Sequence, residues 1–148
     1  MTMTLRPTGL LALGASLVLL MSGALASAPV HASPAARAVP RLEAKLRPSG
    51  DPDGSGKASI SLDKPHGRVC ATITWKGIAT PDAAHIHRGS DGSIVVDLTG
   101  SVTHGSKCAT GVSKKVIAGI LAHPKSYYVN VHNPTFPAGA IQGTLHRP

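Results

Sequence analysis

Apolar and polar residues alternate in short segments along most of this chain, and this two-residue period restricts the fold more than any other feature. Segment 42–47 alternates in this way, as a strand with one buried face does. The period returns in segment 58–63 after a turn-forming stretch rich in Gly, Pro and Asp at 48–56. These two segments therefore predict a β-hairpin. Segment 69–75 shows the same alternation and predicts a third strand.

Further short strands with Gly-rich or Pro-rich joints between them are expected at 85–88, 93–98, 107–112, 127–132 and 140–146. One segment breaks the pattern, because apolar residues recur at helical spacing between Ser113 and Pro124. Ser113 can cap the helix and Pro124 can end it, so one short helix is expected near 113–123. Many strands and a single helix favour an all-β fold, an antiparallel sandwich or barrel.

The N-terminus has the layout of a signal peptide. One positive charge, Arg6, precedes the apolar run 10–21, which is too short to span a bilayer comfortably. Small residues follow, and cleavage is expected after Ala26 or Ala32. The sequence thus predicts a signal peptide at 1–32, a flexible lead-in at 33–39 and one domain at 40–148. The alternative is an uncleaved N-terminal anchor; after cleavage, no transmembrane segment is expected.

Export also bears on Cys70 and Cys108, which are the two cysteines of the chain. Thiols oxidise in extracytoplasmic compartments, so a disulfide is expected. Closing this loop contributes roughly 4 kcal/mol in the chain-entropy model. A metal site built on the two thiolates is the alternative, although the C-x-x-C spacing typical of zinc sites is missing.

The chain is basic, with 15 Lys and Arg against 7 Asp and Glu and a formal net charge of +8. Its cations are scattered singly and it has few aromatic residues, one Trp, one Phe and two Tyr. A basic stripe with stacking aromatic rings is therefore missing, and nucleic acid is not expected as a partner. A solvated cationic surface is one interpretation, and attraction to anionic envelope polymers is the other.

Three histidines form the candidate site. His85 and His87 are two residues apart, so both imidazoles leave the same face of an extended segment. If strand 127–132 lies beside theirs, His132 can join them, and neutral imidazoles bind copper or zinc well. In the alternative interpretation, His85 and His87 bond backbone groups of adjoining loops, while Asn130 and His132 fix the turn into Pro134.

Catalytic patterns are not found. The sequence contains no Gly-x-Ser-x-Gly motif, and both cysteines are assigned to the disulfide. Asp51 and Asp53 lie in a Gly-rich segment that lacks the later Glu of a calcium-binding loop, so this segment is interpreted as a turn. No catalytic residues are proposed, and the chain is not expected to be an enzyme.

A series of short motifs resembles the CHRD domain, the repeated module of chordin that also occurs singly in exported bacterial proteins. The motifs are Ala84-His-Ile-His-Arg-Gly89, Ile94-Val-Val-Asp-Leu98, Tyr127-Tyr-Val-Asn-Val-His-Asn133, Phe136-Pro-Ala-Gly139 and Ile141-Gln-Gly-Thr-Leu145. The resemblance implies an immunoglobulin-like sandwich with limited similarity to copper/zinc superoxide dismutases. Single-domain members often have two cysteines placed like Cys70 and Cys108.

The comparison with dismutases extends to part of their metal chemistry. His85 and His87 resemble the paired copper ligands of those enzymes, but no cluster of His and Asp follows that could form their zinc site. Arg88 is expected on the opposite strand face from both histidines, so it does not match the arginine that guides an anionic substrate. Dismutase activity is therefore not expected.

Together these observations predict a secreted or envelope-associated CHRD-domain protein. We expect a non-enzymatic extracytoplasmic binding module without a cofactor, whose partner is an extracellular protein or an anionic envelope polymer. The alternative is a copper- or zinc-binding protein that uses His85, His87 and His132.

Overall fold

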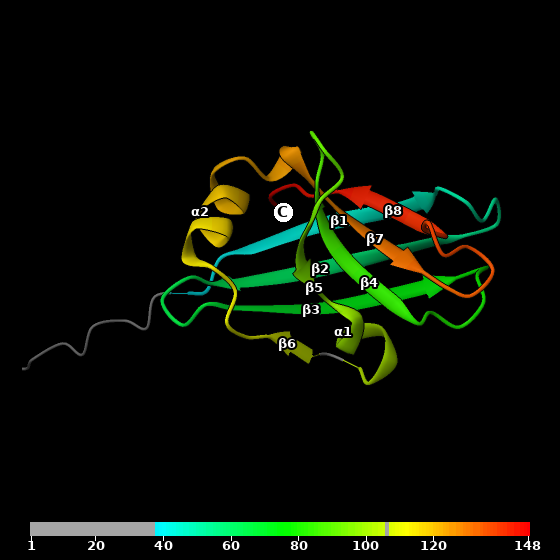
Figure 1. Ribbon diagram of the computed structural model, residues 1–148, viewed down its shortest axis with the longest axis horizontal. Coiled ribbons are helices and arrows are strands. Elements are labelled where there is room, and N and C mark those ends of the chain that lie inside the picture. The colour runs from blue at the N-terminus through cyan, green and yellow to red at the C-terminus, as the bar shows by residue number, and fades with distance from the viewer. Residues whose placement is uncertain (1–37, 106) are drawn as a thin grey trace, which may run out of the picture. The chain divides into compact units, whose positions relative to one another are not determined.

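Eight antiparallel strands form one sheet that curls into a nearly closed barrel (Figure 1). The computed structural model describes residues 38–105 and 107–148, so the expected signal peptide and most of the lead-in lie outside the described residues. The strands follow the order β5-β4-β7-β8-β1-β2-β3-β6. Their bounds are β1 Arg41–Pro48, β2 Ser55–Asp63, β3 Arg68–Lys76, β4 Ala83–Arg88, β5 Ile94–Asp97, β6 Lys107–Ala109, β7 Tyr127–His132 and β8 Ile141–Thr144. The all-β antiparallel fold expected from the sequence is confirmed.

The first three strands form the meander that the alternating segments predict. β1 pairs with β2, and β2 pairs with β3, both in antiparallel register. In β1, Leu42, Ala44 and Leu46 are buried, and the residues between them are exposed. Because side chains of a strand alternate between the two faces of the sheet, this burial pattern reproduces the sequence period directly.

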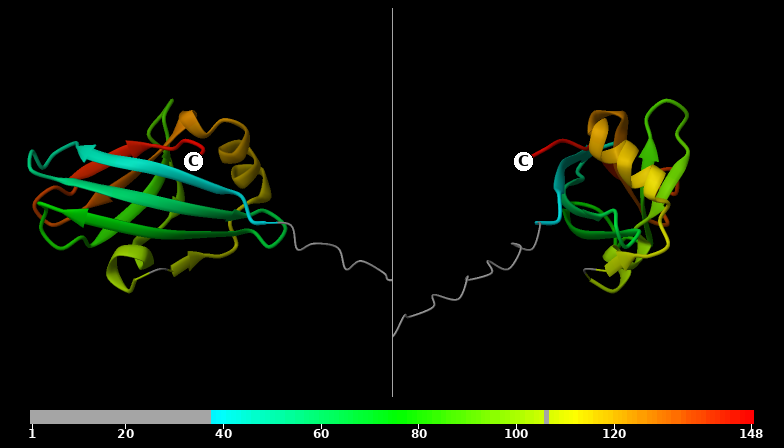
Figure 2. Two further views of the ribbon diagram at one scale, coloured as in Figure 1. Left: turned by 180° about the vertical axis from the view of Figure 1, so that it is seen from behind. Right: turned by 90° about the vertical axis from the view of Figure 1, so that its left-hand side faces the viewer.

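A single hydrophobic core fills the barrel. Figure 1 shows β4 and β7 passing in front of β2 and β3 at an angle, and the side view in Figure 2 shows strands on both sides of the domain. Ile86 on β4 and Val129 on β7 point inward and are fully buried, as are Ile60 and Leu62 on β2. Burying each such side chain contributes about 1.5–3 kcal/mol. The outward faces of β4 and β7 therefore remain for other contacts.

The helix α2 spans Lys114–Ala122 and confirms the helix expected near 113–123. The Ser113 hydroxyl accepts a hydrogen bond from the Lys115 backbone N–H at 3.2 Å, and Ile117 and Ile120 are buried. A single 3-10 turn, η1 at Pro124–Ser126, leads from α2 into β7. No helix among residues 38–105 and 107–148 has the length and apolarity to span a membrane.

Two details differ from the expectation. A short helix, α1 at Thr99–Thr103, follows β5 and packs near β3, β4 and β6 with Ser101 and Val102 buried. The strand expected at 107–112 ends at Ala109 as β6. The chain between β5 and β6, which includes α1, thus connects the two edge strands of the sheet.

The expected disulfide between Cys70 and Cys108 is formed, with an S–S distance of 2.09 Å. The two cysteines are direct partners in the antiparallel pairing of β3 with β6. The covalent bond therefore secures a three-residue edge strand to the meander. A metal site on the two thiolates is excluded in this oxidised form.

Candidate metal centre

The strands β4 and β7 are neighbours in the sheet, and this pairing brings His85, His87 and His132 together. His85 pairs with Asn130 and His87 with Tyr128, while His132 lies opposite Ala83 at the end of the ladder. One ring nitrogen from each histidine lies within 4.8 Å of those of the other two. The sequence predicted that the three imidazoles would meet if the two strands were neighbours, and the structure shows that they are.

Of the two histidines on β4, His87 is the more buried, with only 8% of the residue exposed. Its Nδ1 lies 2.8 Å from the Gly92 carbonyl oxygen, and because a carbonyl only accepts, Nδ1 carries the proton. The Tyr128 ring stacks on the imidazole with centroids 5.0 Å apart. The remaining nitrogen, Nε2, is buried and has no hydrogen-bond partner. A buried, unpaired acceptor of this kind is rare in proteins unless it has a use.

His132 has the same arrangement of its ring. Its Nδ1 lies 3.0 Å from the Pro137 carbonyl oxygen and donates to it. A neutral ring then has a lone pair on Nε2, which lies 3.1 Å from Nδ1 of His85. In His87 and His132 alike, a backbone carbonyl fixes the tautomer that leaves Nε2 free to accept, as in histidines that bind metals.

His85 completes the cluster from β4. Burial is the main cause that lowers its pKa, and the nearby imidazoles of His132 and His87 lower this pKa further. The Asp97 carboxylate, whose Oδ1 is 3.9 Å from His85 Nε2, acts in the opposite direction. The lowered pKa keeps the ring neutral at pH 7, which is the state required of an imidazole ligand.

The loop 133–140 covers the outer side of β7 and supports the site. The Asn130 side-chain Nδ2 donates to the Ala138 carbonyl oxygen at 3.1 Å, one residue beyond the bond from His132 to Pro137. The alternative interpretation, that His85 and His87 bond backbone groups of adjoining loops, describes Nδ1 of His87, whereas His85 contacts the side chains of His132 and Asp97. It leaves the buried Nε2 of His87 without a role.

The structure also shows where the residues lie that the sequence analysis excluded from a functional site. Arg88 is exposed and pairs with Asp91 at 3.6 Å. The Asp51 carboxylate accepts from the Asp53 backbone N–H at 3.3 Å, as a turn residue does. Asp97 was not predicted to belong to the site, because only the pairing of β5 with β4 places it opposite His85.

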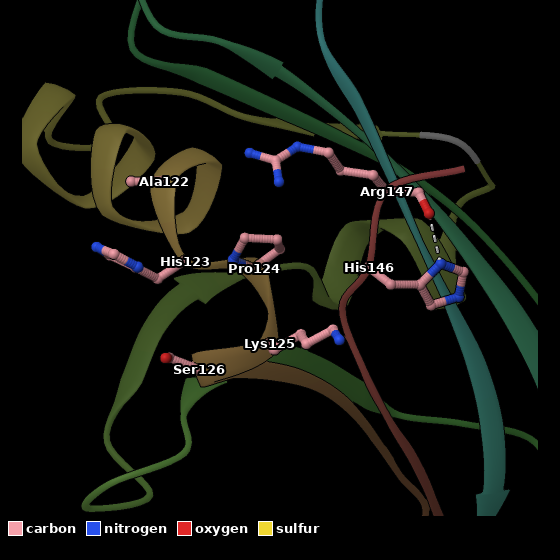
Figure 3. Close-up of a pocket in the computed structure, with 7 residues that line it drawn as sticks. All are labelled: Ala122, His123, Pro124, Lys125, Ser126, His146 and Arg147. Atoms are coloured by element: carbon pink, nitrogen blue, oxygen red, sulfur yellow. Dashed lines mark hydrogen bonds between the residues drawn. The ribbon is translucent and has the colours of Figure 1, made fainter.

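A separate groove of about 470 Å³ lies between the end of α2 and the C-terminal residues (Figure 3). Its lining includes His123, Lys125, His146 and Arg147. Figure 3 shows the imidazoles of His123 and His146 pointing to opposite sides, and one Arg147 nitrogen donates to the Leu121 carbonyl oxygen at 2.9 Å. The groove is basic, but its histidines do not converge as those on β4 and β7 do.

Comparison with known proteins identifies the family. The family model of the CHRD domain matches residues 38–145. No curated protein matches the chain. The matched residues cover most of the chain and include all eight strands, the disulfide and the three clustered histidines. The chain therefore belongs to the CHRD domain family.

Proposed function

We propose that this chain is an exported CHRD domain that binds one copper ion through His85, His87 and His132. The observation that carries the proposal is the buried Nε2 of His87, which has no hydrogen-bond partner and belongs to a cluster of three imidazoles. A neutral three-imidazole set suits copper or zinc, and copper(II) binds such a set more tightly than zinc does.

The distances support a shared ion after a small adjustment. Metal–nitrogen bonds of about 2.0–2.1 Å place two ligand nitrogens no more than about 4 Å apart. The His85 and His132 nitrogens are already 3.1 Å apart, and the whole cluster lies within 4.8 Å. The widest pair thus has to close by less than about 1 Å, a change that side-chain rotation supplies.

The proposed role is binding, in an extracytoplasmic location, without an enzymatic reaction. Membership of a family of extracellular-type modules and an intramolecular disulfide support this location. The expected signal peptide agrees with it. Copper at this site would be held by the domain for storage, delivery or stabilisation of the fold.

Metal titration of the purified protein tests the proposal. We expect the metal-stripped protein to bind one equivalent of Cu(II), with weaker Zn(II) binding, measured by calorimetry and by elemental analysis after gel filtration. His87→Gln should lower the Cu(II) affinity at least tenfold. The matched control is His123→Gln, because His123 is exposed and lies outside the cluster. Thermal unfolding monitored by circular dichroism verifies that both variants are folded.

Two results would contradict the proposal. One is a wild-type protein that binds no copper at micromolar concentration. The other is copper binding that is equally strong after all three clustered histidines are replaced by Gln.

A second proposal keeps the interaction role expected from the sequence, namely binding of an extracellular protein or an anionic envelope polymer. It is supported by the net charge of +8 and by the groove that includes Lys125 and Arg147. Binding to an anionic polymer should weaken steeply as salt is raised from 50 to about 500 mM, because salt screens exposed charges. Lys125→Gln/Arg147→Gln should weaken it, whereas His87→Gln should not. Polymer binding that is insensitive to salt would contradict this proposal.

A further inference from the structure

Asp97 is the carboxylate that faces the histidine cluster from a third strand. It is the last residue of β5 and the direct pairing partner of His85 on β4. Its Oδ1 accepts from the Thr99 backbone N–H at 2.8 Å, which fixes the side chain at the start of α1. The same oxygen lies 3.9 Å from His85 Nε2. Within the described part of the chain, no other carboxylate forms an ion pair with the three clustered rings.

The hydrogen bonds of the cluster favour one position for the proton of His85 in the metal-free protein. His132 donates from Nδ1 to the Pro137 carbonyl oxygen, so its Nε2 accepts. The contact of 3.1 Å between that Nε2 and His85 Nδ1 then favours the His85 tautomer that has its proton on Nδ1. His85 Nδ1 is also the nitrogen that faces the cluster. For His85 to bind a metal ion, this proton has to move to Nε2, the side that Asp97 occupies.

We infer that Asp97 is a positioning residue for the proposed metal site, acting by stabilising the His85 tautomer that has its proton on Nε2. A negative charge beside Nε2 favours an N–H at that nitrogen, and this frees the Nδ1 lone pair for the metal. Carboxylates behind metal-binding histidines act in this way. The inference rests on the proposed function, because it assigns His85 Nδ1 as one of the ligand atoms.

The three histidines thus obtain their metal-binding tautomers in two different ways. Backbone carbonyls of Gly92 and Pro137 set His87 and His132 permanently. His85 instead has a partner on each side, His132 at Nδ1 and Asp97 at Nε2, so its proton can lie at either nitrogen. Metal binding selects the tautomer that has its proton on Nε2, and the Asp97 carboxylate lowers the free energy needed to reach that tautomer.

The variant Asp97→Asn tests the inference. The amide oxygen can still accept from the Thr99 N–H, so the turn into α1 is retained while the negative charge is lost. Asp91→Asn is the matched control, because Asp91 also accepts from a backbone N–H two residues ahead, that of Ser93 at 3.0 Å, and also lies near a cation, Arg88 at 3.6 Å. Asp91 pairs with neither His85 nor His132.

Two measurements at one fixed pH separate positioning from a general structural role. Nitrogen-15 NMR of the metal-free protein reports the His85 tautomer, and we expect Asp97→Asn to reduce the Nε2-protonated fraction while Asp91→Asn leaves it unchanged. Titration with copper or zinc ions should show affinity lowered by roughly tenfold in Asp97→Asn and unchanged in Asp91→Asn.

The outcomes distinguish this inference from the proposal on which it rests. If the wild-type protein binds copper and Asp97→Asn binds it equally well, the inference is wrong and the proposed function stands. An affinity loss without a change of tautomer, or the same changes in Asp91→Asn, also overturns it. If the wild-type protein binds neither metal, the proposed function and the inference fail together.

Discussion

At the scale of single residues, Gly139 shows how tightly the loop 133–140 is packed against β7. Its φ of +130° belongs to a region that favours glycine. A Cβ at this position would also clash with both side-chain polar atoms of Asn130. The loop that holds the His132 ring therefore depends on the absence of a side chain at one position.

The substitution Gly139→Ala should destabilise the protein more than Gly111→Ala does. Gly111 also has positive φ, at +71°, but nothing lies within 4 Å of the place that a Cβ would take there. We expect a cost of about 1–2 kcal/mol for Gly111→Ala from backbone strain. Gly139→Ala should cost about 1–3 kcal/mol more, because the bond from Asn130 to Ala138 breaks in a buried site. Urea unfolding of both variants measures the difference, and equal losses would contradict the packing argument.

Asp63 provides a residue-scale prediction on pH. The hydrogen bond from the His66 ring is the main cause that lowers the pKa of Asp63 from 3.8, and Arg68 contributes in the same direction. Because the folded state favours the ionised carboxyl, this contribution to stability is present above about pH 3.8 and is lost as the pH falls through the lower folded-state pKa.

Asp63→Asn should therefore lower the unfolding temperature at pH 7, and the difference from wild type should shrink as the pH falls below 3.8. Scanning calorimetry from pH 2.5 to 7 measures this. Asp82→Asn is the control, because Asp82 is exposed, and it should follow wild type throughout. If the unfolding temperature of Asp63→Asn is below that of wild type by the same amount at every pH, the charge of Asp63 is not the cause of the difference.

At the scale of elements, the amino end of α2 depends on its cap. Ser113 supplies the side-chain acceptor for the Lys115 N–H, and Gly119 weakens the helix interior. We expect Ser113→Ala to destabilise the protein by about 1 kcal/mol, the usual value of an N-cap. Ser90→Ala, at an exposed loop position, should change stability by less than about 0.5 kcal/mol. Urea unfolding measures both, and equal effects would argue against the capping role.

The elements also show where sequence periodicity succeeds and where it does not. β1 to β3 and α2 were predictable, because each buries one face and the burial appears as a period of two or about 3.6 residues. The helix α1 was missed. Its five residues, Thr-Gly-Ser-Val-Thr, have low helix propensity and are too few to show a period. The hydrogen bond from the Thr99 backbone N–H to the Asp97 carboxylate and the burial of Val102 hold it in place.

At the scale of the whole molecule, the disulfide between Cys70 and Cys108 joins β6 to the meander. The double variant Cys70→Ser/Cys108→Ser should lose about 4 kcal/mol of unfolding free energy, the entropy of a closed loop of this size. Urea unfolding with and without a reducing agent tests this, since reduced wild type should approach the variant. A loss below about 1 kcal/mol would show that the edge strand is held by its backbone pairing alone.

The amino-acid sequence by itself determined the strand segments, the helix near 113–123, the cysteine pair and the shared face of His85 and His87. These are properties of neighbouring residues or of burial that repeats along one element. Only the tertiary structure decided that β7 lies beside β4 and that β5 lies on the other side of β4, because strand order depends on which surfaces pack together and not on a local pattern of residues. That order brings His132 to the other two imidazoles, leaves Nε2 of His87 buried without a partner, and places Asp97 behind His85.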